Sequence, residues 1–130
     1  MAGVIAIGVG CRKACSSAAI VALVERALNQ AGHLTGECAL FTLESKRGEA
    51  NLEDAARALY LPLRFLDHEQ LASEAPRAQT QSSQVERHIG LPSLAETAAL
   101  AGAGPGGELI VARLAESGAT CAIAYCRPAP

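Results

Sequence analysis

One turn in the sequence combines residues that can bind an anion: Gly8-Val9-Gly10-Cys11-Arg12-Lys13. Its glycines allow the backbone to come close to a ligand, and Arg12 and Lys13 add two full positive charges. A helix expected directly afterwards, at Ser16 and Ser17, would add free N–H groups and a partial positive charge. Each such helix-end contact contributes roughly 0.3–1 kcal/mol, so several contacts are needed to hold an acidic ligand tightly. The structural alternative is a glycine turn that lets a helix pack closely on a strand.

A second group of charges follows in the turn Glu44-Ser45-Lys46-Arg47-Gly48-Glu49, which carries two charges of each sign. Because parallel strands end at one edge of a sheet, this turn should lie at the same edge as the first. Lys46 and Glu49 could hold a ligand there or assist proton transfer. The alternative is a solvated turn whose charges pair with one another and contribute a free energy near zero.

Glu96 is a third candidate, as an acid or base, but its place in Ser93-Leu94-Ala95-Glu96 also matches the capping box of a helix N-terminus. Cys11 stands beside Arg12, which could lower the pKa of the thiol, but no histidine lies next to it in sequence to form a nucleophile pair. The three histidines lie far apart, and Cys11 with Cys15 alone cannot close a zinc site. No metal or other cofactor is therefore predicted.

The length of 130 residues predicts a single domain, residues 1–130, and the composition gives it no strong overall charge. The net charge is −2 with both signs interspersed, so nucleic acid is not an expected partner. The five cysteines form an odd set without a C-x-x-C pair, which is typical of reduced thiols. No stretch approaches the roughly 18 apolar residues of a membrane span, and the apolar N-terminus lacks a basic region. The expected location is the cytoplasm, with no membrane partner.

Apolar runs and turn residues predict an alternation of strands and helices. Strands are predicted at 4–9, 38–43, 61–66, 108–114 and 120–126, and helices at 18–28, 51–59, 85–88 and 93–101, with a short one starting at Asp67. The first strand should be central and buried on both faces, and Asn51 is expected to cap the second helix. The last two strands are joined too closely for a crossover helix and should form an antiparallel hairpin. The pattern predicts an α/β protein with a mixed, mostly parallel sheet, helices on both faces and a polar loop at 72–84.

Three segments, taken in order, resemble the CobE and CbiG C-terminal family of cobalamin (vitamin B12) biosynthesis. The first turn is similar to the family's G-x-G-C-R-[RK], and 44–49 is similar to its D-x-K-x-x-E. Ser82 with Val85 resembles S-x-x-V, and 90–100 resembles G-[VT]-x-S-V-A-E-A-A-A-L. In this order and spacing the matches cover nearly the whole chain, whose length resembles the stand-alone CobE more than the longer CbiG.

The chain departs from the family pattern at three places. It has Ala14-Cys15 where the family often has Gly-Thr, Glu44 in place of Asp, and Leu94 in place of Val. Cys15 removes a hydroxyl acceptor, so Ser16 is expected to cap the following helix.

The resemblance implies a compact three-layer α/β/α sandwich and a precorrin or related tetrapyrrole as ligand. Such molecules carry many carboxylates around a large ring, which calls for several dispersed anion contacts. The preferred hypothesis is a cobalamin-biosynthesis protein that binds a precorrin and either carries it between pathway enzymes or assists one of them. The predicted ligand-binding residues are Gly8, Gly10, Cys11, Arg12, Lys13, Ser16, Ser17, Glu44, Lys46, Glu49, Ser82, Ser93 and Glu96.

Two other functions stay open at this point. The activity of the CbiG family implies hydrolytic opening of the ring-A acetate δ-lactone of cobalt-precorrin-5A with loss of acetaldehyde, where Lys46, Glu49 or Glu96 could assist proton transfer. The third class is a phosphate-ligand binding domain. It lacks a nucleotide fingerprint, because position 13 is Lys13 where G-x-G-x-x-G needs glycine, and no G-x-x-x-x-G-K-[ST] occurs.

Overall fold

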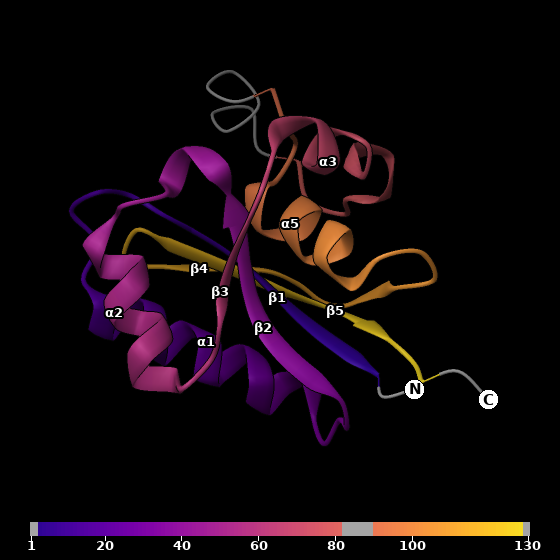
Figure 1. Cartoon of the computed structure of the whole chain (residues 1–130), viewed down its shortest axis with the longest axis horizontal. Helices are drawn as coiled ribbons and strands as arrows, with labels where there is room; N and C mark the ends of the chain where they lie inside the picture. The colour runs from indigo at the N-terminus through magenta and orange to yellow at the C-terminus, as the bar shows by residue number, and fades with distance from the viewer. Residues whose placement is uncertain (1–2, 82–89, 129–130) are drawn as a thin grey trace.

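The computed structural model describes residues 3–81 and 90–128, whose arrangement is shown in Figure 1. The strands are β1 (Val4–Cys11), β2 (Glu37–Leu43), β3 (Leu63–Leu66), β4 (Glu108–Glu116) and β5 (Ala119–Cys126). The α-helices are α1 (Ser17–Ala31), α2 (Ala50–Leu59), α3 (His68–Ala72) and α5 (Leu94–Ala103), and two short 3₁₀ helices are η1 (Glu44–Lys46) and η2 (Ala75–Arg77). The predicted helix at 85–88 lies outside the described residues.

The five strands form one mixed sheet in the order β3-β2-β1-β5-β4, with β1 at its centre as the sequence predicts. β1 pairs in parallel with β2, and β2 with β3, whereas β5 is antiparallel to both β1 and β4. β4 therefore runs in the same direction as β1. The mixed, mostly parallel sheet and the C-terminal hairpin are confirmed. We call the edge at which β1, β2 and β3 end the carboxyl edge.

Helices cover both faces of the sheet: α1 and α2 lie on one face, and α3 and α5 on the other (Figure 1). The alternation of side chains along β1 separates the two cores. Ile5, Ile7 and Val9 pack with α1 and α2, whereas Ala6 packs with α5. The predicted α/β/α sandwich is confirmed.

The core between the sheet and α5 is thin because α5 lies directly on β1. A Cβ atom added to Gly8 would come within 1.9 Å of the Ala95 carbonyl oxygen and within 2.7 Å of another α5 backbone atom. At Gly10 an added Cβ would meet Thr120 Oγ1 at 2.7 Å and the side chain of Leu94 at 3.1 Å. These glycines make room for a helix, as in the structural alternative, but the helix is α5 and not the α1 that follows them in sequence.

Several element boundaries differ from the predicted ranges by one to three residues, and two of the differences have identifiable reasons. α2 begins at Ala50 with Glu49 as its N-cap, so the predicted cap at Asn51 is wrong. β4 and β5 extend closer to each other than predicted, because Ser117 and Gly118 adopt φ of 53° and 84° and close a two-residue turn. The predicted polar loop at 72–84 begins at the last residue of α3 and contains η2, and its end at 82–84 lies outside the described residues. The capping box that begins the short helix α3 is confirmed, since Asp67 and Gln70 bond each other's backbone N–H groups.

Candidate functional site

The turn that follows β1 lies at the carboxyl edge, where Arg12, Lys13 and Ala14 are exposed. We call residues 12–15 the cationic turn. A hydrogen bond of 3.0 Å from Cys15 N to Arg12 O closes it, and Arg12 N donates to Gly118 O at 3.0 Å. The second bond ties the turn to the connection between β4 and β5, and Figure 1 shows these segments side by side. The turn thus presents its cationic side chains to solvent from a fixed base.

The second charged turn reaches the first through two side chains. Lys46 Nζ donates to Cys11 O at 3.2 Å. Asn51 Nδ2 donates to Cys15 O at 2.9 Å and to Arg12 O at 3.3 Å. The two turns therefore meet at the carboxyl edge, as the parallel pairing of β1 and β2 predicts.

The charges of the second turn pair with one another, and the two pairs differ in exposure. Arg47 and Glu44 lie 3.8 Å apart with side chains 62% and 60% exposed, so this pair contributes little. Arg47 also lies over the ring of Phe65, 4.4 Å from its centroid. Lys46 and Glu49 are 3.8 Å apart as well, but their side chains are only 25% and 17% exposed. The solvated-turn alternative therefore describes Glu44 and fails to describe the partly buried Lys46–Glu49 pair.

Glu49 has a buried carboxylate oxygen that accepts no hydrogen bond from the described residues. Within residues 3–81 and 90–128, its Oε1 is the buried side-chain atom that lacks a hydrogen-bond partner. Leaving a buried acceptor without a donor costs about 1–3 kcal/mol. Its Oε2 faces Lys46 Nζ at 3.8 Å, which is longer than a hydrogen bond. The carboxylate therefore has unused capacity to accept a hydrogen bond.

Cys11 ends β1 with its thiol against the same group of residues, 3.6 Å from Asn51 Nδ2. Burial, and then the negative charge of Glu49, raise the pKa of the Cys11 thiol to about 11, although Lys46 opposes the shift. The expectation that this turn lowers the pKa is therefore wrong, because the thiol is buried while the side chain of Arg12 is exposed. The thiol is protonated at neutral pH and is a poor nucleophile.

The N-terminus of α1 adds a positive helix end to the carboxyl edge. Ser16 is its N-cap and accepts from Ala19 N at 3.1 Å, so the expected capping by Ser16 is confirmed. Ser17 is the first residue of the helix and is half-buried. Cys15 is buried, and burial raises the pKa of its thiol. The helix end and the cationic turn therefore share one location.

Glu96 lies on the opposite face of the sheet, fully buried on α5. Its Oε1 accepts from the backbone N–H groups of Gln79 and Thr80, both at 2.8 Å, and its Oε2 accepts from Thr80 Oγ1 at 2.7 Å and Arg113 N at 2.9 Å. Burial acts to raise the pKa of Glu96, but these hydrogen bonds outweigh it and hold the pKa below its usual range. Ser93 does cap α5, accepting from Glu96 N at 3.2 Å. The predicted capping box is thus half correct, because the carboxylate binds other segments.

The chain is similar to known proteins both in sequence and in fold. The family described as "Cobalamin synthesis G C-terminus" matches residues 5–124. The chain belongs to this family. Protein CobE from Sinorhizobium sp is 36% identical over 119 residues, which are 91% of this chain and 77% of that protein. The resemblance carried by the motifs is confirmed, and the chain is a cobalamin-biosynthesis protein of the CobE and CbiG type.

Two solved structures share the fold of this cobalamin family member. The crystal structure of CobE, a protein from the cobalamin (vitamin B12) biosynthetic pathway, matches with a TM-score of 0.87 and 33% identity, over 98% of this chain and 94% of that one. The crystal structure of the cobalamin biosynthesis protein chiG from Agrobacterium tumefaciens matches with a TM-score of 0.70 and 36% identity, over 96% of this chain and 99% of that one. The α/β/α architecture is therefore shared with these relatives.

The structure divides the family motifs between two places. The cationic turn and the D-x-K-x-x-E segment meet on the α2 side of β1. Glu96 lies on α5 and Ser93 is the N-cap of that helix, on the opposite face of the sheet, and Glu96 faces β4. Gly8 lies beneath α5, and Ser82 lies outside the described residues. The residues predicted as one site therefore lie on both faces of the sheet.

Asn51 is the residue on the α2 side of β1 that sequence reasoning missed as a site residue. Its amide was expected to cap α2, which is a local task, whereas it contacts residues 11–15 across the carboxyl edge. The sequence did contain one indication of this role: Asn51 follows two residues after Glu49, the last residue of the segment that resembles the family's D-x-K-x-x-E.

Among residues 3–81 and 90–128, no three His, Cys, Asp or Glu side chains are grouped so that they could hold a metal ion. In the same part of the chain, no helix is long and apolar enough to cross a membrane.

Proposed function

We propose that this protein binds a precorrin or a related tetrapyrrole polycarboxylate at the carboxyl edge, on the α2 side of β1. The single observation that carries the proposal is the meeting of the cationic turn with the Lys46 turn, through Lys46 and Asn51. Two exposed cations, Arg12 and Lys13, stand there beside the N-terminus of α1. The bound intermediate is carried between cobalamin-pathway enzymes or presented to one of them.

Dispersed contacts suit such a ligand. One helix end contributes roughly 0.3–1 kcal/mol and one exposed charge a similar amount, so a single carboxylate would bind weakly. A tetrapyrrole offers a carboxylate to each of several contacts at once. Because Arg12 and Lys13 are held on a short closed turn, their charges act from neighbouring positions without first ordering a loop.

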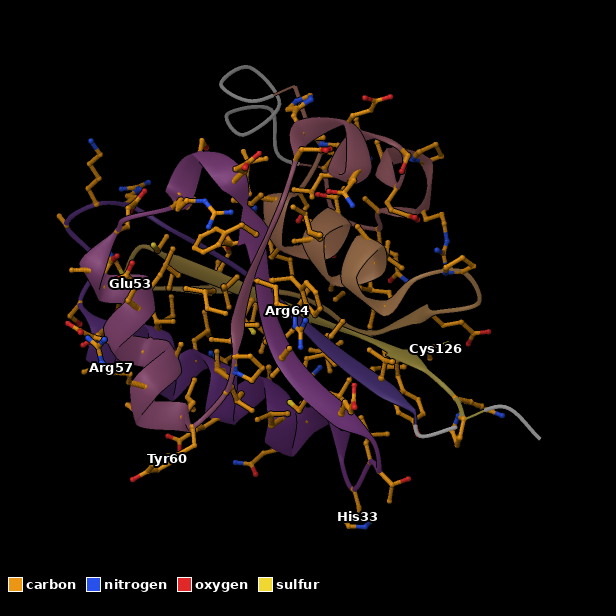
Figure 2. All side chains as sticks on the ribbon, viewed as in Figure 1. His33, Glu53, Arg57, Tyr60, Arg64 and Cys126 are labelled. Carbon is orange, nitrogen blue, oxygen red and sulfur yellow. The ribbon has the colours of Figure 1, made fainter. Side chains whose placement is uncertain are left out.

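The decisive experiment is isothermal titration of purified precorrins into the wild-type chain and two double variants. Arg12→Ala with Lys13→Ala should weaken binding about tenfold or more. Arg57→Ala with Arg64→Ala is the matched control, since both residues are exposed and removing them changes the net charge equally. Figure 2 labels these two control residues on α2 and β3. No binding of any precorrin to the wild-type protein, or protection from unfolding by nucleotides instead, would refute the proposal.

The Lys46–Glu49 pair favours a second candidate, hydrolysis of the δ-lactone of a cobalt-precorrin-5A-like intermediate. Glu49 has a buried oxygen without a donor and so is able to take a proton from an attacking water. Lys46, 25% exposed, can stabilise the negative charge that develops on the lactone oxygen. Glu96 is not part of this candidate, because both of its oxygens already accept hydrogen bonds in a fully buried place.

Acetaldehyde release tests this second candidate directly. Wild-type protein incubated with the lactone should release acetaldehyde, and Glu49→Gln should abolish the release. Glu53→Gln, an exposed acid on the first turn of α2 that Figure 2 labels, should leave it unchanged. A wild-type protein that binds the lactone without releasing acetaldehyde is a carrier and not a hydrolase.

We also propose that residues 1–130 act as one domain in the cytoplasm. The sheet supports one domain, since β5 from the C-terminal part of the chain pairs directly with β1 from the N-terminal part. The free thiols of all five cysteines are compatible with a reducing compartment. A single calorimetric unfolding transition and recovery of the protein in the cytoplasmic fraction would support both statements.

A further inference from the structure

Asn51 is the side chain that connects α2 to the cationic turn. Its Nδ2 lies 2.9 Å from Cys15 O and 3.3 Å from Arg12 O, and Cys11 Sγ is a longer contact at 3.6 Å. Its Oδ1 accepts from Leu52 N at 2.9 Å. A primary amide has two N–H donors, so the two carbonyl groups use both.

The partners of the amide determine its orientation. With Oδ1 on the Leu52 N–H group, both hydrogens of Nδ2 face carbonyl oxygens. The reversed amide would place its oxygen against the same carbonyls and lose both hydrogen bonds. A carboxylate would do the same, since it can only accept. Position 51 therefore requires a donor, which asparagine supplies and aspartate does not.

The carbonyl groups held by Asn51 decide where the neighbouring N–H groups point. In a trans peptide the C=O of one residue and the N–H of the next point in opposite directions, and no peptide bond in residues 3–81 and 90–128 is cis. Arg12 O and Cys15 O face Asn51, so the N–H groups of Lys13 and Ser16 face away from it. The same rule holds one residue earlier: Cys11 O accepts from Lys46, and the next N–H group donates to Gly118 O on the hairpin.

We propose that Asn51 is a positioning residue that turns the carbonyl groups of the cationic turn inward and so presents the N–H groups of Lys13 and Ser16 to a ligand carboxylate. The proposed function supplies the ligand, whereas the geometry stands without it. The assignment also accounts for the start of α2, where the N-cap Glu49 makes no side-chain cap while the amide of Asn51 bonds the turn. Backbone N–H groups at such a turn bind an anion in addition to the side-chain charges.

The test begins with Asn51→Ala in the full chain, which removes the donor without changing the charge. The amides of Arg12 and Cys15 form the hydrogen bonds that hold the turn, so their hydrogen exchange should become about tenfold faster or more. Affinity for uroporphyrin, a stable tetrapyrrole polycarboxylate, should fall about tenfold in isothermal titration, the effect of losing two oriented hydrogen-bond donors.

Two acidic variants separate positioning from charge. Asn51→Asp should lose the same affinity plus a further part that disappears at high salt, because it also adds a negative charge. Ala50→Asp adds that charge one residue earlier, at an exposed position, and should show the salt-sensitive part alone. If Asn51 served only α2, aspartate at position 51 would be tolerated, because an acid is favourable in the first turn of a helix. Hydrogen exchange at Arg12 and Cys15 and the affinity for uroporphyrin at high salt would then match the wild type in Asn51→Asp.

The outcomes distinguish this inference from the proposed function. Unchanged exchange at Arg12 and Cys15 in Asn51→Ala would overturn the positioning role, whatever the ligand. Faster exchange with unchanged uroporphyrin affinity would overturn the link to the ligand. A wild-type protein that binds neither uroporphyrin nor precorrins would refute the proposed function, while faster exchange would still support the positioning role. If Asn51→Ala does not fold, the isosteric Asn51→Asp at high salt answers the same question.

Discussion

The two sides of β1 hold their acidic groups in opposite ways. On the α5 side, Glu96 is fully buried and its two oxygens accept hydrogen bonds from Gln79, Thr80 and Arg113. On the α2 side, Glu49 keeps one buried oxygen without a donor, and its cationic neighbour is 25% exposed. Both acids belong to segments that resemble motifs of the cobalamin family, but their surroundings differ in nearly every physical respect.

This difference separates an acid that stabilises the fold from one that is free to act. A buried carboxylate whose oxygens accept hydrogen bonds mainly from backbone N–H groups fixes the segments that supply them. An incompletely satisfied buried carboxylate costs stability, and a catalytic role or a bound group is one explanation for such an atom. The α2 side is therefore where we expect the ligand, and the α5 side is where we expect mutations to unfold the chain.

The largest effect is expected from Gly8→Ala on the α5 side. The new Cβ would lie 1.9 Å from the Ala95 carbonyl oxygen, a backbone atom that cannot move away without displacing α5. The free energy of unfolding should fall by about 4 kcal/mol or more in urea denaturation. Gly10→Ala is the matched comparison, because its close neighbours are side-chain atoms of Thr120 and Leu94 that can shift, and it should cost about 1–2 kcal/mol. Equal effects at the two glycines would mean that α5 is not held against β1.

Glu96→Ala should produce the next largest loss of stability. It removes the acceptor from three backbone N–H groups and one hydroxyl, all in partly buried positions, which would be left without their protein partner. The expected cost is about 3 kcal/mol in the free energy of unfolding, measured in urea. Glu96→Gln keeps the shape and one acceptor oxygen, and should lose less. A cost below about 1 kcal/mol for the alanine variant would show that the segment around Thr80 does not depend on Glu96.

A smaller effect, with a defined direction, is expected from pH. The hydrogen bonds hold the pKa of Glu96 below its usual range despite burial, and an unfolded glutamate titrates near about 4.3. A lowered folded pKa contributes stability that is fully present above the unfolded value and is lost as pH falls through the folded value. The difference in unfolding free energy between wild type and Glu96→Gln should therefore be constant between about pH 6 and pH 8 and shrink below about pH 4. A difference that persists undiminished at about pH 3 would contradict this assignment.

The sequence was sufficient for the features that depend on local pattern. The buried central strand, the hairpin and the capping by Ser16 follow from residue types that are adjacent in the chain. The partner of Gly8 could not be predicted, because a glycine leaves space without indicating which helix fills it, and α5 lies about ninety residues later. The contact of Arg12 with Gly118 has the same origin in long-range packing.

The location of the candidate site was predictable, because it depends only on the order and direction of the strands. Parallel pairing of β1 and β2 brings their two following turns to one edge, and this was foreseen. The tasks of Asn51 and Glu96 were not, because both residue types are suited to helix capping and also to long-range hydrogen bonds. Local sequence favours the first use for both. Their actual partners, on the cationic turn and on β4, are fixed by tertiary structure.

The smallest effect on stability should come from Glu49→Gln, although it changes an acid of the proposed site. Glu49 makes no cap for α2 and its interaction with Lys46 spans 3.8 Å, so little is lost, and removing a buried charge without a donor offsets that loss. The free energy of unfolding should change by less than about 1 kcal/mol, while lactone turnover, if the second candidate holds, should disappear. Glu53→Gln should change neither property. If Glu49→Gln instead destabilises the chain as strongly as Glu96→Ala, both acids hold the fold, and the α2 side loses its claim to be the functional one.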